Sequence, residues 1–168
     1  MALLIPTQLF RDVSAITPEY LAGQGIRALV LDVDNTLTAH GSQEVSPAVS
    51  DWLARMKAAG IGLAIASNNF EKRVAPFAQR IGVQHVSFCC KPAPFGLARA
   101  RHILGVERGA LALVGDQIFT DSLGAHLYGI KMLLVRPVTR DIKMLIRARR
   151  WLEQPVLRRY FEQGGTIL

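Results

Sequence analysis

The chain has 168 residues, half of them hydrophobic and 20% charged, which suits one globular domain and excludes a disordered chain. Its net charge of +7 predicts anionic partners, namely phosphate esters, lipid headgroups or nucleic acid, without choosing among them. No apolar stretch reaches the roughly 20 residues that cross a bilayer, and the first residues lack the basic region and cleavage site of a signal peptide.

Five short apolar runs predict the strands of a sheet. The runs do not alternate apolar with polar residues, which is typical of strands buried on both faces. In chain order, the expected strands cover residues 28–31, 61–66, 84–88, 110–114 and 132–135.

Helical patterns lie between these runs. Ser46 and Pro47 offer an N-cap and a first-turn proline, and Gly60 ends that helix. The next expected helix, residues 70–81, contains Pro76, which either kinks it or marks its true start. Further helices are expected at residues 94–104 and 121–128, with a basic helical segment at 139–163.

Strands that alternate with helices predict a single α/β domain over residues 1–168. We expect a three-layer, Rossmann-like fold, in which helices flank a central parallel five-stranded sheet through right-handed crossovers.

Two adjacent cysteines, Cys89 and Cys90, follow the third expected strand. Adjacent cysteines close a disulfide only with strain, and these form no CxxC pair for zinc. We therefore expect two buried free thiols and a reducing, cytoplasmic compartment.

Polar residues stand where three of the strands end. Asp32, Ser67 and Asp116 each follow an apolar run at or near its end. Open parallel sheets bind ligands beyond the carboxyl ends of their strands. The three side chains are therefore expected to meet at one rim, and this convergence indicates a functional site.

Paired carboxylates at this rim suggest a metal site. Asp32 and Asp34 face one pocket if the chain turns between them, and a divalent cation relieves the cost of burying them. Oxygen ligands suit Mg²⁺, and Asp116 supplies another carboxylate. A turn with a helix cap is the alternative for the first pair. Asp121, one turn further on, is either a weaker metal ligand or the N-cap of the next helix.

Groups that could hold a phosphate complete the rim. The Ser67 hydroxyl, with the neighbouring amides at Asn68, stands at a strand-to-helix junction that can bind phosphate oxygens. Lys91 follows the third strand and can neutralise a phosphoryl group. The alternatives are an ordinary N-cap for Ser67 and a solvated side chain for Lys91.

In order and spacing, these motifs resemble those of the haloacid dehalogenase superfamily of phosphatases. The resemblance spans about residues 27–137. The Ser67-Asn68-Asn69 and Gly115-Asp116-Gln117 variants of the motifs, with Leu4-Ile5-Pro6 near the start, resemble the YqeG-like, subclass IIIA branch. This branch is related to phosphatidylglycerophosphate phosphatases. The matching runs are Asp32-Val33-Asp34-Asn35-Thr36-Leu37, Ser67-Asn68-Asn69, Lys91-Pro92 and Gly115-Asp116-Gln117-Ile118-Phe119-Thr120-Asp121.

The resemblance implies a role for each matching residue. Asp32 would be the nucleophile that forms an aspartyl-phosphate, and Asp34 the general acid and base. The resemblance also implies a strand order of 5-4-1-2-3. Ser67, Asn68 and Lys91 would bind the phosphoryl group, while Mg²⁺ would be held by Asp32, the Asp34 backbone carbonyl, Asp116 and, more weakly, Asp121.

The spacing between the motifs leaves no room for a cap domain over the site. Residues 38–60 hold a loop and one helix, and residues 70–88 hold one helix and a strand. An open site suits a bulky substrate, such as a lipid or a macromolecule. A partner subunit could also cover the site, so an oligomeric protein is an alternative.

The C-terminal segment is basic, with a partial apolar stripe at helical spacing. It either packs on the domain with a solvated basic face, or lies on the inner face of an anionic membrane. Contact with nucleic acid is disfavoured, because no binding module accompanies the charge. Its basic residues are Arg136, Arg140, Lys143, Arg147, Arg149, Arg150, Arg158 and Arg159.

The sequence therefore predicts a magnesium-dependent phosphatase for a phosphomonoester, with phosphatidylglycerophosphate as the leading substrate. A soluble sugar or nucleotide phosphate, or a phosphoprotein, is the first alternative. A non-catalytic adaptor that binds RNA or protein is the second.

Overall fold

The computed structural model describes residues 2–139 and 144–168. The predictions for Arg140 and Lys143, and for the side chains of Arg147 and Arg149, lie outside the described residues. Six parallel strands form one sheet in the order β1-β6-β5-β2-β3-β4. They are β1 (Gln8–Phe10), β2 (Ala28–Leu31), β3 (Gly62–Ala66), β4 (Gln84–Val86), β5 (Leu111–Gly115) and β6 (Lys131–Val135).

The α/β, Rossmann-like fold is confirmed, and the five expected strands lie in the expected order. The prediction of five strands was one short. The additional strand, β1, lies at the edge and pairs in parallel with β6, with Gln8 opposite Leu133 and Phe10 opposite Val135.

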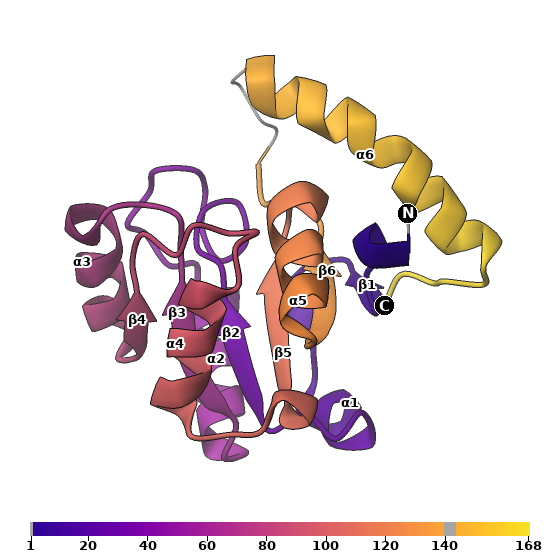
Figure 1. Ribbon diagram of the computed structural model, residues 1–168. Helices are drawn as coiled ribbons and strands as arrows, with labels where there is room; N and C mark the ends of the chain where they lie inside the picture. The colour runs from indigo at the N-terminus through magenta and orange to yellow at the C-terminus, as the bar shows by residue number, and fades with distance from the viewer. Residues whose placement is uncertain (1, 140–143) are drawn as a thin grey trace.

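Helices cover both faces of the sheet (Figure 1). Residues of β2 alternate between two apolar clusters, because successive side chains of a strand point to opposite faces. Leu29 and Leu31 join the cluster that contains Trp52, whereas Ala28 and Val30 join the other. The helices are α1 (Pro18–Gly23), α2 (Pro47–Ala58) and α3 (Glu71–Ile81) on the first cluster, and α4 (Phe95–Leu104), α5 (Leu123–Tyr128) and α6 (Met144–Glu162) on the second.

The helices form near their predicted positions, and their bounds differ slightly from the prediction. The Ser46 hydroxyl accepts a hydrogen bond from the Val49 N–H at 3.3 Å and caps α2. Pro76 lies inside α3 and does not mark its start. A π-helical turn over Ile118–Ser122 precedes α5, so Asp121 stands inside this turn and not at a helix start.

Within the described residues, no separate cap domain stands over the carboxyl ends of the strands. A loop joins β2 to α2, and α3 is the one helix between β3 and β4. Figure 1 shows α6 set apart from the other helices, running down toward the two chain termini. None of the described helices is long and apolar enough to cross a membrane.

The expectation of two buried thiols was wrong for one of them. Cys89 is buried and Cys90 is exposed, and both are free. Cys90 has a positive φ of 58°, because the chain turns sharply between β4 and Lys91. This turn directs Lys91 into the domain while it leaves the neighbouring thiol at the surface.

Candidate active site

The residues predicted to meet at the rim do meet. Asp32 follows β2, Ser67 follows β3 and Asp116 follows β5, and all three are buried. A cavity of about 200 Å³ lies at this rim beside Asp32 and Ser67. Its walls are formed by Asp32, Asp34, His40, Ser67, Asn68, Asn69, Lys91, Gln117, Thr120 and Asp121.

Lys91 is not solvated, because its side chain is only 2% exposed and lies between two carboxylates. Its Nζ is 2.6 Å from Asp32 Oδ1 and 2.7 Å from Asp121 Oδ1. Burial by itself lowers the pKa of the ammonium group, but the charges of Asp121 and Asp32 outweigh it and raise the pKa. Lys91 is therefore a fixed cation beside the predicted nucleophile.

Asn68 holds the backbone of Lys91 from both sides. Its Oδ1 accepts a hydrogen bond from the Lys91 N–H at 2.6 Å, and its Nδ2 donates to the Lys91 carbonyl at 2.9 Å. The side chain of Asn68 thus positions Lys91, and phosphate binding at Asn68 stays a prediction.

Ser67 is not the N-cap of the helix that follows it. The residue in the N-cap position of α3 is Phe70. The Ser67 hydroxyl instead accepts a hydrogen bond from the Asn69 N–H at 3.2 Å, in a tight turn at the wall of the cavity. Ser67 therefore lines the site, and phosphate binding by its hydroxyl stays a prediction.

Asp32, Asp116 and Asp121 form a buried acidic cluster. One carboxylate oxygen from each lies within 4.8 Å of those of the other two. The Thr36 hydroxyl donates to Asp116 Oδ1 at 3.3 Å. Three carboxylates from separate positions are the hard oxygen donors that Mg²⁺ prefers, so the donor set fits a divalent cation.

Burial and the neighbouring carboxylates raise the pKa values of two acids in this cluster. Burial raises the pKa of Asp32 to about 6, although Lys91 lowers it. Burial raises the pKa of Asp116 to about 8, although Arg150 lowers it. In both cases the neighbouring carboxylates raise the pKa further, so a bound cation would favour the ionised forms.

The Asp34 carboxylate binds partners on the other side of the cavity. It accepts hydrogen bonds from Asn69 Nδ2 at 2.5 Å, Arg73 Nη2 at 3.0 Å and the Gly41 N–H at 2.7 Å. The sequence did not predict these partners. Asn69 lay inside the quoted Ser67-Asn68-Asn69 run, whereas nothing in the sequence pattern distinguished Arg73 from other helix arginines.

Asp121 does not cap a helix. Its Oδ1 contacts Lys91, and its Oδ2 accepts a hydrogen bond from the Gln117 N–H at 3.1 Å. Gly115 makes this position available, because a Cβ there would lie 2.5 Å from Asp121 Cγ. The glycine before Asp116 is thus required by the packing of the site.

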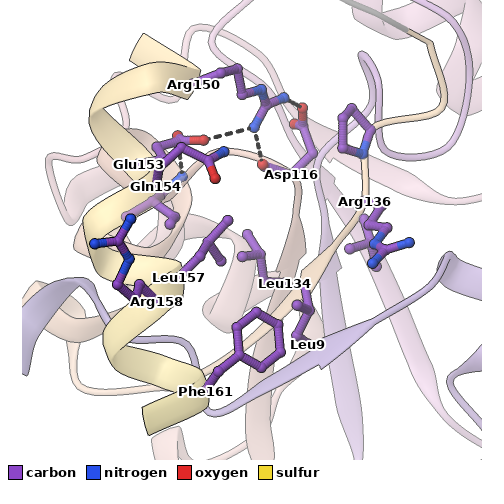
Figure 2. Close-up of a pocket in the computed structure, with 13 residues that line it drawn as sticks. Leu9, Asp116, Leu134, Arg136, Arg150, Glu153, Gln154, Leu157, Arg158 and Phe161 are labelled. Carbon is purple, nitrogen blue, oxygen red and sulfur yellow. Dashed lines mark hydrogen bonds and ion pairs between the residues drawn. The ribbon is translucent and has the colours of Figure 1, made fainter. Parts of the chain in front are cut away.

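A second unpredicted residue, Arg150 of α6, contacts the acidic cluster (Figure 2). Its guanidinium pairs with the Asp116 carboxylate and donates to the Asp116 backbone carbonyl. It also donates to Glu153 Oε2 at 3.1 Å, while Glu153 Oε1 accepts from the Ile118 N–H at 2.8 Å. These contacts fasten α6 to the loop after β5.

Comparison with known protein families supports the chemistry that this geometry suggests. The sequence model of the haloacid dehalogenase-like hydrolase family matches residues 39–129. The chain belongs to this family. The match contains Ser67, Lys91 and Asp116 but begins after Asp32 and Asp34, which the structure places beside the other three.

Curated relatives of this family member are phosphatases by name. The chain is 30% identical over 153 residues to "Probable phosphatase YqeG" of Bacillus subtilis, covering 91% of this chain and 89% of that protein. It is 26% identical over 171 residues to phosphatidylglycerophosphate phosphatase 1 of Arabidopsis thaliana, covering 96% of this chain. The chain spans about half, 49%, of that plant protein.

Solved structures share the fold. A deoxy-D-mannose-octulosonate 8-phosphate phosphatase of Haemophilus influenzae superposes with a TM-score of 0.54 at 13% identity, covering 75% of each chain.

From the family model and the Bacillus subtilis relative, the chain is a YqeG-like phosphatase of the haloacid dehalogenase family, a phosphoric monoester hydrolase. Its acidic cluster is compatible with a divalent metal. Membership of subclass IIIA stays a prediction.

Proposed function

We propose that this chain hydrolyses a phosphomonoester in two steps, with Asp32 as the nucleophile and Mg²⁺ as the cofactor. The observation that supports this most strongly is the position of Asp32. Its carboxylate lies 2.6 Å from a buried lysine and belongs to the acidic cluster with Asp116. A carboxylate held between a fixed cation and a metal site is suited to attack phosphorus.

In the first step, a carboxylate oxygen of Asp32 attacks phosphorus. The bond from phosphorus to the alcohol oxygen breaks, and the departing oxygen takes a proton from Asp34. In the second step, Asp34 removes a proton from water, which attacks phosphorus and releases phosphate from Asp32. Asn69 and Arg73 hold the Asp34 side chain at the wall of the same cavity, which places it near the reacting oxygens in both steps.

The positive and polar groups of the cavity bind the phosphoryl oxygens. Lys91 neutralises charge on both the phosphoryl group and Asp32, and the Ser67 hydroxyl donates a hydrogen bond. Asn68 contributes through the position it gives to Lys91.

The metal would be held by the Asp32 and Asp116 carboxylates and the Asp34 backbone carbonyl. Asp121 would support this set more weakly, because its oxygens already contact Lys91 and the Gln117 N–H. When bound, magnesium supplies charge that orients the phosphoryl group and stabilises the transition state.

For the substrate, phosphatidylglycerophosphate is the leading candidate. Two relatives are named as phosphatases of this lipid, and a site without a cap domain in the described residues suits a bulky ester. The basic surface is consistent with a cytoplasmic protein in peripheral contact with an anionic membrane, and nucleic acid is not needed as a partner. A soluble sugar or nucleotide phosphate, or a phosphoprotein, is the alternative substrate.

Phosphate release across a substrate panel tests this proposal. The panel contains an aryl phosphate, phosphatidylglycerophosphate, a sugar phosphate, a nucleotide and a phosphopeptide, each with magnesium and with a chelator. We expect metal-dependent release from the aryl and lipid esters, and none from Asp32→Asn. Undiminished activity in Asp32→Asn would disprove the mechanism, while rapid turnover of a soluble ester with none of the lipid would disprove the lipid assignment. A protein inactive on every ester would favour the adaptor hypothesis.

A further inference from the structure

A second and larger cavity lies beneath α6. Its volume is about 560 Å³, within the range of about 300–1,000 Å³ typical of small-molecule sites. We call it the α6 cavity. Figure 2 shows α6 on one side of it and the ends of β1 and β6 on the other.

The α6 cavity combines an apolar floor with a cationic rim. Arg136 follows β6, and Arg150 and Arg158 lie on α6, against the two acids Asp116 and Glu153. Both acids already receive contacts from Arg150, so the charge around the remaining space is positive. The apolar floor is formed by Leu9, Ile118, Leu134, Val135, Leu157 and Phe161.

The α6 cavity adjoins the cavity of about 200 Å³ beside Asp32 and Ser67, which we call the catalytic cavity. Asp116 and Ile118 line the α6 cavity, whereas Gln117 between them lines the catalytic one. Successive residues after β5 thus face two sides of one segment. A substrate that occupies both cavities therefore has to extend around this segment, next to the Asp116 and Arg150 pair.

We propose that the α6 cavity binds the alcohol portion of the substrate, and that this portion carries an anionic group next to an apolar chain. The proposal rests on the function proposed above and assigns the part of the chain that selects the substrate. The apolar chain lies on the floor of the cavity, with Phe161 as its outer contact. The anionic group is bound at the rim by Arg136 and Arg158.

The structure of α6 supports this occupant over a purely apolar one. An apolar ligand gains nothing from arginines at the rim, whereas an anionic group on the ligand is attracted to them. Phe161 is 43% exposed, and the ligand would remove this ring from water. Arg150 and Glu153 fasten α6 to the loop after β5, so α6 forms the cavity as a fixed wall.

Binding of the alcohol alone gives the direct test. A short-chain phosphatidylglycerol is a suitable probe, because it carries an anionic phosphodiester and acyl chains but no phosphomonoester. Calorimetric titration below its micelle concentration compares wild type with Phe161→Ala and Arg136→Ala. We expect saturable binding to wild type and about tenfold weaker binding to each variant.

The controls are matched on the same helix. Trp151→Ala removes an exposed aromatic of α6 that does not line the cavity, and Arg159→Ala removes an arginine that does not line it. Both should bind the probe as wild type does. Equal affinity in all five proteins, or no binding to wild type, would overturn the proposal.

Turnover separates this proposal from the proposed function. Phe161→Ala and Arg136→Ala should lower kcat/KM for phosphatidylglycerophosphate by about tenfold and change aryl phosphate turnover less than about twofold. Equal losses on both esters would overturn the role of the cavity. If wild type hydrolysed neither ester, the phosphatase mechanism would fail, while the binding titration would still test the cavity.

A second copy of the chain is the competing occupant. Sedimentation at increasing concentration detects it, with the probe absent. A wild-type dimer that Phe161→Ala converts to monomer would overturn the proposal. A wild type that stays monomeric, or a dimer unaffected by Phe161→Ala, agrees with a cavity that is open to ligand.

Discussion

Arg150 and Asp116 form an ion pair that joins the C-terminal helix to the acidic cluster. The Asp116 side chain is completely buried, and that of Arg150 is 20% exposed. A buried carboxylate needs a compensating cation, and in the metal-free protein this cation is Arg150. The pair therefore links α6 to the site where we propose that magnesium binds.

Replacement of this arginine should destabilise the metal-free protein. At about pH 9, where Asp116 is ionised, Arg150→Ala is expected to lower the free energy of unfolding by about 1–3 kcal/mol. Saturating magnesium should reduce this difference, because the metal then neutralises Asp116. Urea denaturation with and without magnesium measures both values.

Arg159→Ala is the control for this substitution, since Arg159 is an exposed arginine of the same helix. It should change stability by less than about 0.5 kcal/mol. A loss in Arg150→Ala no larger than in Arg159→Ala would show that the ion pair contributes nothing.

Magnesium affinity should rise with pH. Burial raises the pKa of Asp32 to about 6 and of Asp116 to about 8, from an ordinary value of 3.8. Protons therefore compete with the metal below these values. Calorimetric titration between about pH 5.5 and 8.5 should show tighter binding at each step, and a flat profile would contradict the metal site.

The same shifts predict how the metal-free protein responds to pH. Both pKa values are higher in the folded state, so the two groups favour folding most below about pH 4. This contribution is lost as pH rises through 6 and then 8. Urea denaturation without metal measures the decline, and Asp116→Asn should remove the upper part of it.

Much of this site was predictable from the sequence because its residues follow buried strands. The apolar runs before Asp32, Ser67 and Asp116 need no knowledge of tertiary contacts to be interpreted. β1 was missed because it has three residues at the sheet edge, and the strand that it pairs with lies more than a hundred residues later. A short edge strand has too little pattern of its own.

Arg150 and Arg73 were missed for a related reason. Arg150 lies 34 positions from Asp116 in a run of basic residues that is typical of a solvated surface. Arg73 reaches Asp34 across 39 positions. Ion pairs at such separations depend on how helices dock, which one sequence does not contain.

Gly115 should tolerate no side chain. Gly115→Ala places a Cβ 2.5 Å from the Asp121 carboxylate, which has to move and thereby release Lys91. We expect a loss of about 2–4 kcal/mol in stability and at least about a hundredfold in kcat. Gly109→Ala is the control, because nothing lies within 4 Å of its added Cβ, and equal effects of the two variants would refute the packing role.

Arg73 should act on catalysis through Asp34. Arg73→Ala leaves the Asp34 carboxylate with the Asn69 and Gly41 contacts, so its position loosens. We expect kcat to fall about tenfold to a hundredfold with a smaller change in KM. Arg80→Ala, on the same helix and exposed, should retain kcat. A normal kcat and an unaltered pH profile in Arg73→Ala would refute the positioning role.

In the proposed mechanism, Asp32 carries the phosphoryl group during turnover. The most direct measurement is borohydride trapping of protein that is turning over an aryl phosphate with magnesium, followed by peptide mass spectrometry. Borohydride reduces an acyl phosphate to an alcohol, which converts the phosphorylated aspartate to homoserine. We expect homoserine at position 32 and aspartate at positions 34, 116 and 121. Phosphate release with unmodified Asp32, or with homoserine at any of the other positions, would contradict it.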